Sequence, residues 1–327
     1  MRKINAGTVI INSEERCLSR CTFCPGVLVD NLSSSEKLEK FKKDSQHFIS
    51  QGVQEIEISG VDPIQYSRIV EAVKYLKDNG VSKVVLSTHG RNLKDKTLAQ
   101  ELASAGLDYC RIPLYGSTAE LHNKVMHYVA PHDPGSMSVG NSFEDMTEAI
   151  HNCSDVNIYI KGHIVPNQYN QHDISNIIDL YLDLTQGKMV NLVVASACIA
   201  DKSEEYTSDW YLPIKDSKEV LNSIVDHSIV SRYPRISYLV MDYPYCVLGK
   251  MHPNIKNLNL VPNMGTYRIA EDVRSEVSDH IPSYRIKTFF NDCDTCVAKG
   301  LCAGIYKNDL EMFGSEGLSP LTPERFF

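Results

Sequence analysis

Strand–helix alternation is the feature that most constrains the fold of this chain of 327 residues. Short apolar runs of the kind that form buried strands are each followed by a segment with apolar residues at helical spacing. One such unit is Glu55–Ser59 followed by Ile64–Asp78, which Asn79 and Gly80 end. Neighbouring parallel strands need crossover connections, so the alternation predicts a parallel sheet covered by helices.

The alternation extends to about residue 227 and then changes. We expect six strands, at Thr8–Ile11, Glu55–Ser59, Lys83–Ser87, Tyr109–Leu114, Asn157–Val165 and Met189–Ala195. We expect helices at Lys37–Ser50, Ile64–Asp78, Leu93–Ala105, Ser142–His151, Ile174–Leu184 and Ser217–Val225. Such a sheet is either open and doubly wound or curled into a full or partial barrel, and in each case loops at the carboxyl ends of the strands form the site. Residues 228–327 are predicted to form a second, smaller domain after a first domain at 1–227.

Composition excludes several classes of protein. Acidic residues outnumber basic ones 41 to 33, for a net charge of −8, which disfavours nucleic acid as a partner. The chain has no run of 18 apolar residues, and its first five residues lack the apolar core of a signal peptide. We therefore expect a cytoplasmic protein without a membrane partner.

Ten cysteines stand out in a chain with no sign of export. In a reducing cytosol they serve metal binding, catalysis or burial rather than disulfides. Six of them form two groups near the ends of the chain, which burial alone explains poorly. The first group is Cys17, Cys21 and Cys24, and the second is Cys293, Cys296 and Cys302.

The first group places three thiols within eight residues, in the loop after the first expected strand. Thiolates suit zinc or iron–sulfur clusters. Three of them can hold three corners of a [4Fe–4S] cube and leave the fourth iron open. Structural zinc sites usually pair C-x2-C units or add histidine, and no histidine lies near this loop in the sequence.

The spacing Cys17-x3-Cys21-x2-Cys24, its place after the first strand and the aromatic Phe23 resemble the radical S-adenosylmethionine (radical SAM) superfamily. The resemblance implies a partial (β/α)6 barrel. It also implies a [4Fe–4S] cluster on these cysteines that binds SAM, and cleavage of SAM to a 5′-deoxyadenosyl radical that abstracts hydrogen from the substrate. A flavodoxin- or ferredoxin-type protein would supply the electron.

Further segments resemble the family's SAM-binding strand ends. The segment from Ser59 through Gly60 to Asp62 and Pro63 stands where the family has Gly-Gly-Glu-Pro, with Val61 and Asp62 replacing Gly and Glu. Similar segments lie after the later strands, with Tyr115 at a position that is often acidic and Ser117 as a substitute contact. The resemblance implies SAM contacts for Ser59, Gly60, Asp62, Thr88, Tyr115, Ser117 and Asn167.

The second group, Cys293-x2-Cys296-x5-Cys302, resembles the SPASM and twitch modules that hold auxiliary clusters in radical SAM enzymes. The usual fourth cysteine after this motif is missing, and Cys246 is the best candidate to replace it. The resemblance then implies one auxiliary [4Fe–4S] cluster on four thiolates. Zinc remains the alternative, because four thiolates also form a tetrahedral zinc site.

Three functions remain open. The segment Cys293–Pro323, with Ile112–Gly116, resembles maturases of the His-Xaa-Ser system, which implies cross-linking, oxidation or epimerisation of a ribosomally made peptide. Few residues precede Cys17, so we expect a peptide to require a partner protein or direct contact. The same chemistry on a small molecule, such as an aminocyclitol or sugar, is the second possibility. A zinc-stabilised binding protein without catalysis is the third.

Cys198 lies just beyond the sixth expected strand, where side chains can face the cavity. A thiol there could return a hydrogen atom to a substrate radical. The alternative is that Cys198 fills space as a small apolar residue.

Overall fold

The structure is a computed structural model that describes most of the chain. The described residues are 6–14, 17–24, 31–128, 141–199, 209–226, 236–248, 258–261, 287–300, 302 and 304–326. The expected boundary between the two domains, near residue 227, lies outside these ranges and stays a prediction.

The main sheet has eight strands, and every neighbouring pair is parallel. In sheet order these are β1 (Ala6–Ile10), β3 (Glu55–Ser59), β4 (Lys83–Ser87), β5 (Tyr109–Pro113), β7 (Tyr159–Ile164), β8 (Met189–Ala195), β9 (Ser237–Met241) and β10 (Leu258–Val261). The α/β class and the partial barrel are confirmed. Two further strands, β9 and β10, follow the six strands of the alternation and extend the same sheet.

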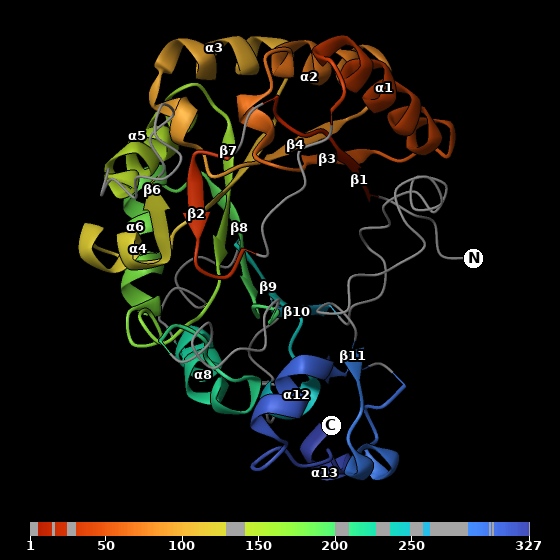
Figure 1. The fold of residues 1–327 in the computed structure, drawn as a ribbon, viewed down its shortest axis with the longest axis vertical. Coiled ribbons are helices and arrows are strands. Elements are labelled where there is room, and N and C mark those ends of the chain that lie inside the picture. The colour runs from red at the N-terminus through yellow and green to blue at the C-terminus, as the bar shows by residue number, and fades with distance from the viewer. Residues whose placement is uncertain are drawn as a thin grey trace.

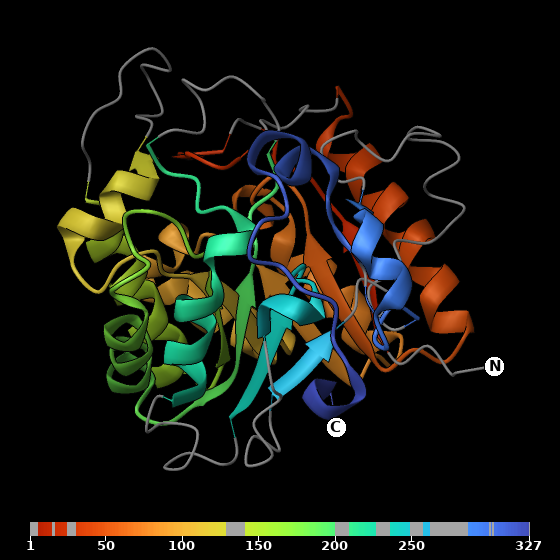
Figure 2. The same cartoon turned by 90° about the horizontal axis from the view of Figure 1, so that it is seen from below.

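Helices cover the outer face of the curled sheet (Figures 1 and 2). They are α1 (Ser34–Ser50), α2 (Ile69–Asp78), α3 (Lys96–Ala105), α4 (Ala119–Val125), α5 (Ser142–Asp155), α6 (Ile174–Thr185) and α8 (Lys218–Asp226). Helix α1 begins with a capping box, in which Ser33 and Glu36 bind each other's backbone amides. Apolar residues such as Leu38, Phe41 and Phe48 then recur at helical spacing and are fully buried.

Side chains of the strands divide between the two faces of the sheet. Ile56 and Ile58 of β3 are fully buried in the apolar core under the helices, whereas Glu55 and Glu57 alternate with them and point to the other face. Glu55 Oε1 accepts a hydrogen bond from Lys161 Nζ at 2.7 Å, although β4 and β5 separate β3 from β7 in the sheet. Strands about 4.8 Å apart bring such side chains together only when the sheet curls.

Two expected helices begin later than their periodicity predicts. Pro63 begins the short 3-10 helix η1 (Pro63–Gln65), and α2 starts only at Ile69. Likewise, η2 (Arg91–Lys94) precedes α3, whose N-cap Asp95 accepts a hydrogen bond from Thr97 N. In both places a short 3-10 helix contains the first residues of the apolar pattern. The Asp95 cap then sets the start of α3, whereas at α2 it is Pro63 that turns the chain first.

The remaining elements are short. An antiparallel pair joins β2 (Ser19–Cys21) to β6 (Met126–Tyr128), and another joins β11 (Lys287–Thr288) to β12 (Ile305–Tyr306). The short helix η3 (Ile214–Asp216) precedes α8, and the C-terminal part adds α10 (Tyr245–Leu248), η5 (Asn291–Thr295), α12 (Lys307–Phe313) and α13 (Pro323–Phe326). This part lies beside the β9–β10 end of the sheet (Figure 1). Among the described residues, no helix is both long and apolar enough to cross a membrane.

Candidate functional site

Three cysteines lie on the loop after β1, and a short antiparallel pairing fixes that loop. Cys21 ends β2 and pairs with Met126 of β6, and Thr22 N donates to Val125 O at 3.0 Å. Cys24 N donates to Cys21 O at 3.0 Å and closes a tight turn. The expected loop is therefore anchored at its centre, and none of its three cysteines forms a disulfide.

Two side chains from the neighbouring strand ends hold the same loop. Leu18 N donates to Gln65 Oε1 at 3.0 Å, and the Arg91 guanidinium donates to Leu18 O at 3.3 Å. Arg91 also forms an ion pair with Asp145 of α5 at 2.6 Å. The sequence alone did not indicate these anchors, because Gln65, Arg91 and Asp145 lie 47 to 127 positions away from Leu18.

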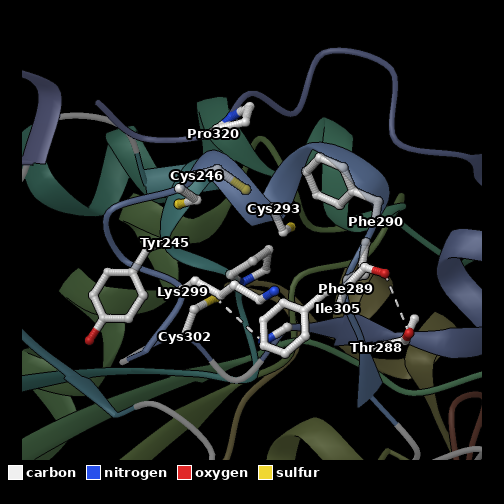
Figure 3. Close-up of a pocket in the computed structure, with 13 residues that line it drawn as sticks. Tyr245, Cys246, Thr288, Phe289, Phe290, Cys293, Lys299, Cys302, Ile305 and Pro320 are labelled. Atoms are coloured by element: carbon white, nitrogen blue, oxygen red, sulfur yellow. Dashed lines mark hydrogen bonds between the residues drawn. The ribbon is translucent and has the colours of Figure 1, made fainter. Parts of the chain in front are cut away.

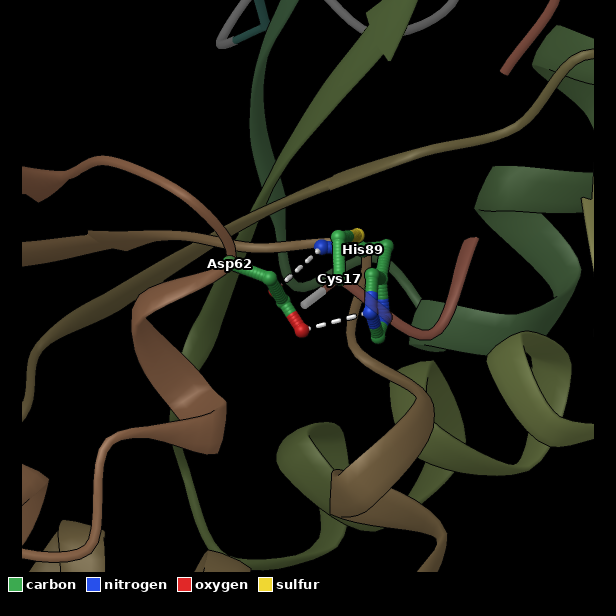
Figure 4. A group of neighbouring side chains, drawn as sticks. All are labelled: Cys17, Asp62 and His89. Carbon is green, nitrogen blue, oxygen red and sulfur yellow. Dashed lines mark hydrogen bonds and ion pairs between the residues drawn. The ribbon is translucent and has the colours of Figure 1, made fainter. Parts of the chain in front are cut away.

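Asp62 and His89 meet beside Cys17 (Figure 4). His89 Nε2 lies 2.5 Å from Asp62 Oδ2, and the ligand atoms of Cys17, Asp62 and His89 all lie within 4.8 Å of one another. Asp62 takes the left-handed conformation at φ 39°, which turns its carboxylate toward the end of β4. The structure therefore brings to the first cysteine a histidine that its sequence neighbourhood lacks.

Burial and the neighbouring charges have opposite effects on the pKa of His89. Burial alone lowers the pKa of His89, but the Asp62 carboxylate and the Cys17 sulfur outweigh burial and raise this pKa to about 9. Arg91 N points at Nδ1 from 3.2 Å, a contact that requires an unprotonated Nδ1 and so works against the increase. The contact with Arg91 N favours the neutral tautomer with its proton on Nε2, the atom that lies beside Asp62 Oδ2 and Gln65 Oε1.

The expected SAM contacts at the ends of β3 and β4 lie together. Asp62 Oδ1 accepts hydrogen bonds from Thr88 Oγ1 at 2.5 Å and from His89 N at 3.1 Å. Ser59 O accepts from Ile11 N at 2.8 Å, and Gly60 follows at φ 144°. The backbone of this turn thus lies against the strand that leads into the cysteine loop.

The expected contacts after β5 and β7 are buried and engaged within the protein. Tyr115 is 3% exposed, and its ring contacts Phe23 of the cysteine loop with centroids 5.2 Å apart. Ser117 donates through N and Oγ to Asp173, at 2.6 and 2.8 Å. Asn167 is fully buried and caps its own turn by donating to Val165 O at 3.0 Å. The roles of these three residues toward SAM stay predictions.

The cysteine loop has the donor chemistry that an iron–sulfur cluster requires. Burial and the neighbouring sulfurs of Cys17 and Cys24, together with Asp62, raise the pKa of Cys21 well above its ordinary value. Ionising Cys21 beside the other two sulfurs is therefore unfavourable unless a bound cation neutralises the charge. Ser19 N also donates to Cys17 Sγ at 3.4 Å, the type of bond that stabilises cluster sulfurs.

A second group of cysteines lines one pocket in the C-terminal part (Figure 3). Its wall is otherwise mostly apolar, with Phe289, Phe290 and Ile305 among its residues. Four cysteines from three separate segments reach it. They are Cys246 of α10, Cys293 of η5, Cys296 and Cys302.

The four thiols of this pocket influence one another. Burial, and then the sulfurs of Cys302, Cys293 and Cys296, raise the pKa of Cys246 to about 12. Backbone amides point at two of the sulfurs, from Leu321 N to Cys296 Sγ at 3.3 Å and from Gly304 N to Cys302 Sγ at 3.4 Å. The set fits either a cluster or zinc, since both bind four thiolates.

The other cysteines lie elsewhere. Cys198 is half-buried and packs against the apolar core. Cys110 of β5 and Cys153 of α5 are fully buried and hydrogen-bonded to each other.

Comparison with known proteins places this site in a family. A family model described as the radical SAM superfamily matches residues 11–181, the stretch from the end of β1 into α6. The chain belongs to the radical SAM superfamily. The match covers the three cysteines and the strand ends around Asp62, Thr88, Tyr115 and Asn167.

Similarity to individual proteins is weaker. A probable GTP 3',8-cyclase of Saccharolobus islandicus (strain M.14.25 / Kamchatka #1) is 28% identical over 172 residues, 51% of this chain and 50% of that protein. A GTP 3',8-cyclase of Rhizobium etli (strain CIAT 652) is 23% identical over 215 residues, 63% of this chain and 56% of that protein. The chain spans about half the length of the curated relatives it matches.

Solved radical SAM structures share the fold. Streptococcus suis SuiB bound to its precursor peptide SuiA aligns with a TM-score of 0.57 and 16% identity, over 97% of this chain and 75% of that one. SuiB bound to S-adenosylmethionine aligns with a TM-score of 0.55 and 16% identity, over 72% of this chain and 50% of that one. At these identities the likeness concerns the fold.

Proposed function

We propose that this radical SAM enzyme binds a [4Fe–4S] cluster on Cys17, Cys21 and Cys24 and modifies a ribosomally made peptide by cross-linking, oxidation or epimerisation. The converging thiols of the anchored loop support the cluster assignment most directly. When bound, the cluster supplies the electron that cleaves SAM to a 5′-deoxyadenosyl radical. A flavodoxin- or ferredoxin-type protein delivers that electron.

The residues around the loop bind and orient SAM. The turn after β3, at Ser59 and Gly60, contacts the SAM amino group in this proposal, and the missing side chain of Gly60 lets this turn pack against the strand that leads into the cysteine loop. Asp62 already binds Thr88 and His89, so it acts by shaping this turn and by setting the charge beside Cys17. Tyr115 and Phe23 form the apolar wall that keeps water away from the reacting atoms.

The pocket of Cys246, Cys293, Cys296 and Cys302 holds an auxiliary [4Fe–4S] cluster in this proposal. Backbone amides directed at two of its sulfurs support a cluster of thiolates. With four protein ligands the cluster has no open iron, which favours electron transfer over substrate binding. Cys198 serves as a hydrogen donor if the reaction is an epimerisation.

A peptide substrate is supported by one observation. The structure of SuiB, which was solved with a precursor peptide, aligns with 97% of this chain and so includes the C-terminal part. A small-molecule substrate is the second candidate. The curated relatives, named as GTP 3',8-cyclases, favour it, but they match only about half of the chain.

Anaerobic reconstitution tests the chemistry. Protein loaded with iron and sulfide, then given dithionite and SAM, should form 5′-deoxyadenosine. Replacing Cys17, Cys21 and Cys24 by Ala should abolish this product and lower the iron content by about half if two similar cubes are present. Absence of both the product and cluster absorbance in the wild-type chain would overturn both enzyme proposals, and zinc in place of iron at the C-terminal site would remove the electron relay.

The substrate class needs a separate measurement. A short open reading frame beside the gene would supply a candidate peptide, and mass spectrometry after incubation with it should show loss of hydrogen or an unchanged mass with inverted stereochemistry. Genes for sugar or nucleotide enzymes in that place, with no change in any neighbouring peptide, would favour the small molecule. A cytoplasmic location is proposed because ten cysteines, none of them in a disulfide, suit a reducing compartment.

A further inference from the structure

Helix α12 of the C-terminal part binds the segment that follows β8 through buried polar groups. Asn308 Nδ2 donates to Ile199 O at 2.8 Å. Tyr211 OH and Ile214 N both donate to Asp309 Oδ2, at 2.5 and 3.1 Å. Asp309 is fully buried, so this is a fixed junction between sequence-distant segments.

Burying Asp309 at this junction costs folding free energy that an apolar residue would not. Its second oxygen, Oδ1, is buried and has no hydrogen-bond partner among the described residues. A buried carboxylate with an unsatisfied oxygen destabilises a fold relative to an apolar or fully bonded group. Its presence at this junction therefore favours a role beyond packing.

Trp210, the residue before Tyr211 in the segment that Asp309 binds, contacts the three-cysteine loop. Trp210 is 4% exposed, and its ring contacts Tyr211 on one side and Phe23 on the other, with centroids 5.4 and 6.3 Å apart. Phe23 directly precedes Cys24. Trp210 O also accepts from Gln168 N at 2.9 Å, beside the turn after β7.

At the N-terminus of α12, where Asn308 and Asp309 also lie, the helix begins shortly after a cysteine of the C-terminal pocket. Gly304 N donates to Cys302 Sγ, and Gly304 takes φ +80° with its Cα packed so tightly that an added Cβ would lie 2.4 Å from Thr288 O. The next two residues form β12, which pairs with β11. Cys302 and Asp309 are therefore only seven positions apart, and Gly304 and the β12 pairing constrain the chain between them.

We propose that Asp309 is a positioning residue that couples the C-terminal cysteine pocket to the three-cysteine loop through Tyr211 and Trp210. Filling of the pocket fixes Cys302 and hence α12, and Asp309 then holds Trp210 against Phe23 beside Cys24. This inference rests on the proposed metal-binding role of the pocket.

Trp210 is the only tryptophan of the chain, so its fluorescence reports on this junction directly. The probe is Zn²⁺, which binds four thiolates but, as a d10 ion, does not quench emission as an iron–sulfur cluster does. The protein is the full chain with Cys17, Cys21 and Cys24 replaced by Ala, so that the C-terminal pocket is the tested site. One equivalent of Zn²⁺ should shift the Trp210 emission maximum.

Variants on this background separate coupling from simple binding. Asp309→Asn removes the charge at constant shape, and Tyr211→Phe removes the hydroxyl but keeps the ring that stacks on Phe313 with centroids 5.5 Å apart. Both should bind one equivalent of Zn²⁺ and lose the emission shift. Tyr159→Phe is the matched control, because Tyr159 is 44% exposed on β7, and it should keep the shift.

The outcomes distinguish the two proposals. Bound zinc without any emission shift, or an equal shift in Asp309→Asn and Tyr211→Phe, overturns the coupling and leaves the metal site intact. Failure of the pocket to bind zinc, and of the wild-type chain to hold more than one cluster's iron, overturns the proposed auxiliary site and the coupling with it. Zinc titration followed by Trp210 emission tests the coupling, and iron analysis of the wild-type protein tests the auxiliary site.

Discussion

At the residue scale, Gly60 is the described glycine at which an added side chain would meet the shortest contact. It has φ +144°, and an added Cβ would lie 2.2 Å from Ile11 O. Only a residue without a side chain lets the turn after β3 lie this close to the end of β1. The packing of this turn against the strand that leads into the cysteine loop therefore requires a residue without a Cβ at position 60.

Replacing Gly60 by Ala should lower the free energy of unfolding by about 3 kcal/mol or more, because strain and a backbone clash add. Gly52→Ala is the matched control. Gly52 also has positive φ, at +73°, but nothing lies within 4 Å of the added Cβ, so a loss of only about 1 kcal/mol is expected. Urea unfolding measures both, and equal losses would contradict the role of the contact with Ile11.

His122 makes stability depend on pH. Burial, with a smaller effect from Arg91, lowers its pKa from 6.5 to about 3, and its Nε2 has no hydrogen-bond partner among the described residues. A group whose pKa falls on folding stabilises the fold above its unfolded pKa, and this stability is lost as the pH falls from 6.5 toward 3.

Between pH 6 and 4, His122→Gln should reduce the slope of unfolding free energy against pH by up to about 1.4 kcal/mol per pH unit. Urea titrations at several pH values measure the slope. His151→Gln is the control, because His151 has a half-exposed side chain on α5 and should leave the slope nearly unchanged. An unchanged slope in His122→Gln would show that His122 is not buried as a neutral ring.

At the element scale, a buried ion pair joins β3 to β5 on the inner face of the sheet. Arg111 Nε and Nη2 donate to the two oxygens of Glu57 at 3.1 and 2.8 Å, and both residues are 7% exposed. Such a pair contributes little net stability, but removing one partner leaves a buried charge alone. The strands are thus sensitive to single changes and tolerant of paired ones.

Arg111→Met should cost about 3–5 kcal/mol of unfolding free energy, and adding Glu57→Leu should restore most of it. Chemical denaturation of the two single variants and the double variant measures the coupling. Additive losses in the double variant would mean that Glu57 and Arg111 do not compensate each other.

At the scale of the whole molecule, Cys246 is the residue whose role depends most on the tertiary structure. It comes from α10 and reaches the pocket of three cysteines that lie 47 to 56 positions later in the chain. Cys198 is equally half-buried but does not line that pocket. The two cysteines therefore form a matched pair for testing the ligand set.

Cys246→Ala should remove about half of the iron from the reconstituted protein, because a cube normally needs its full set of thiolates. Cys198→Ala should keep the wild-type iron content. Iron and sulfide analysis with absorbance spectra measures both. Wild-type iron in Cys246→Ala would exclude this residue as a ligand.

The sequence by itself determined the parallel sheet and both cysteine groups. Apolar periodicity and the spacing of Cys17, Cys21 and Cys24 are local properties, and local patterns survive without knowledge of the fold. They predicted β3, β4 and β8 with their observed bounds. Helix starts such as that of α2 were less accurate, because Pro63 turns the chain first.

Only the tertiary structure decided which distant side chains meet. His89 and Asp62 lie beside Cys17, although they are far from it in the sequence. Asp309 accepts a hydrogen bond from Tyr211, which lies 98 positions earlier. These contacts depend on how far the sheet curls and how the C-terminal part packs, and no periodicity encodes either. Burial then makes each such contact strong, since charges and hydrogen bonds without water must find partners inside the protein.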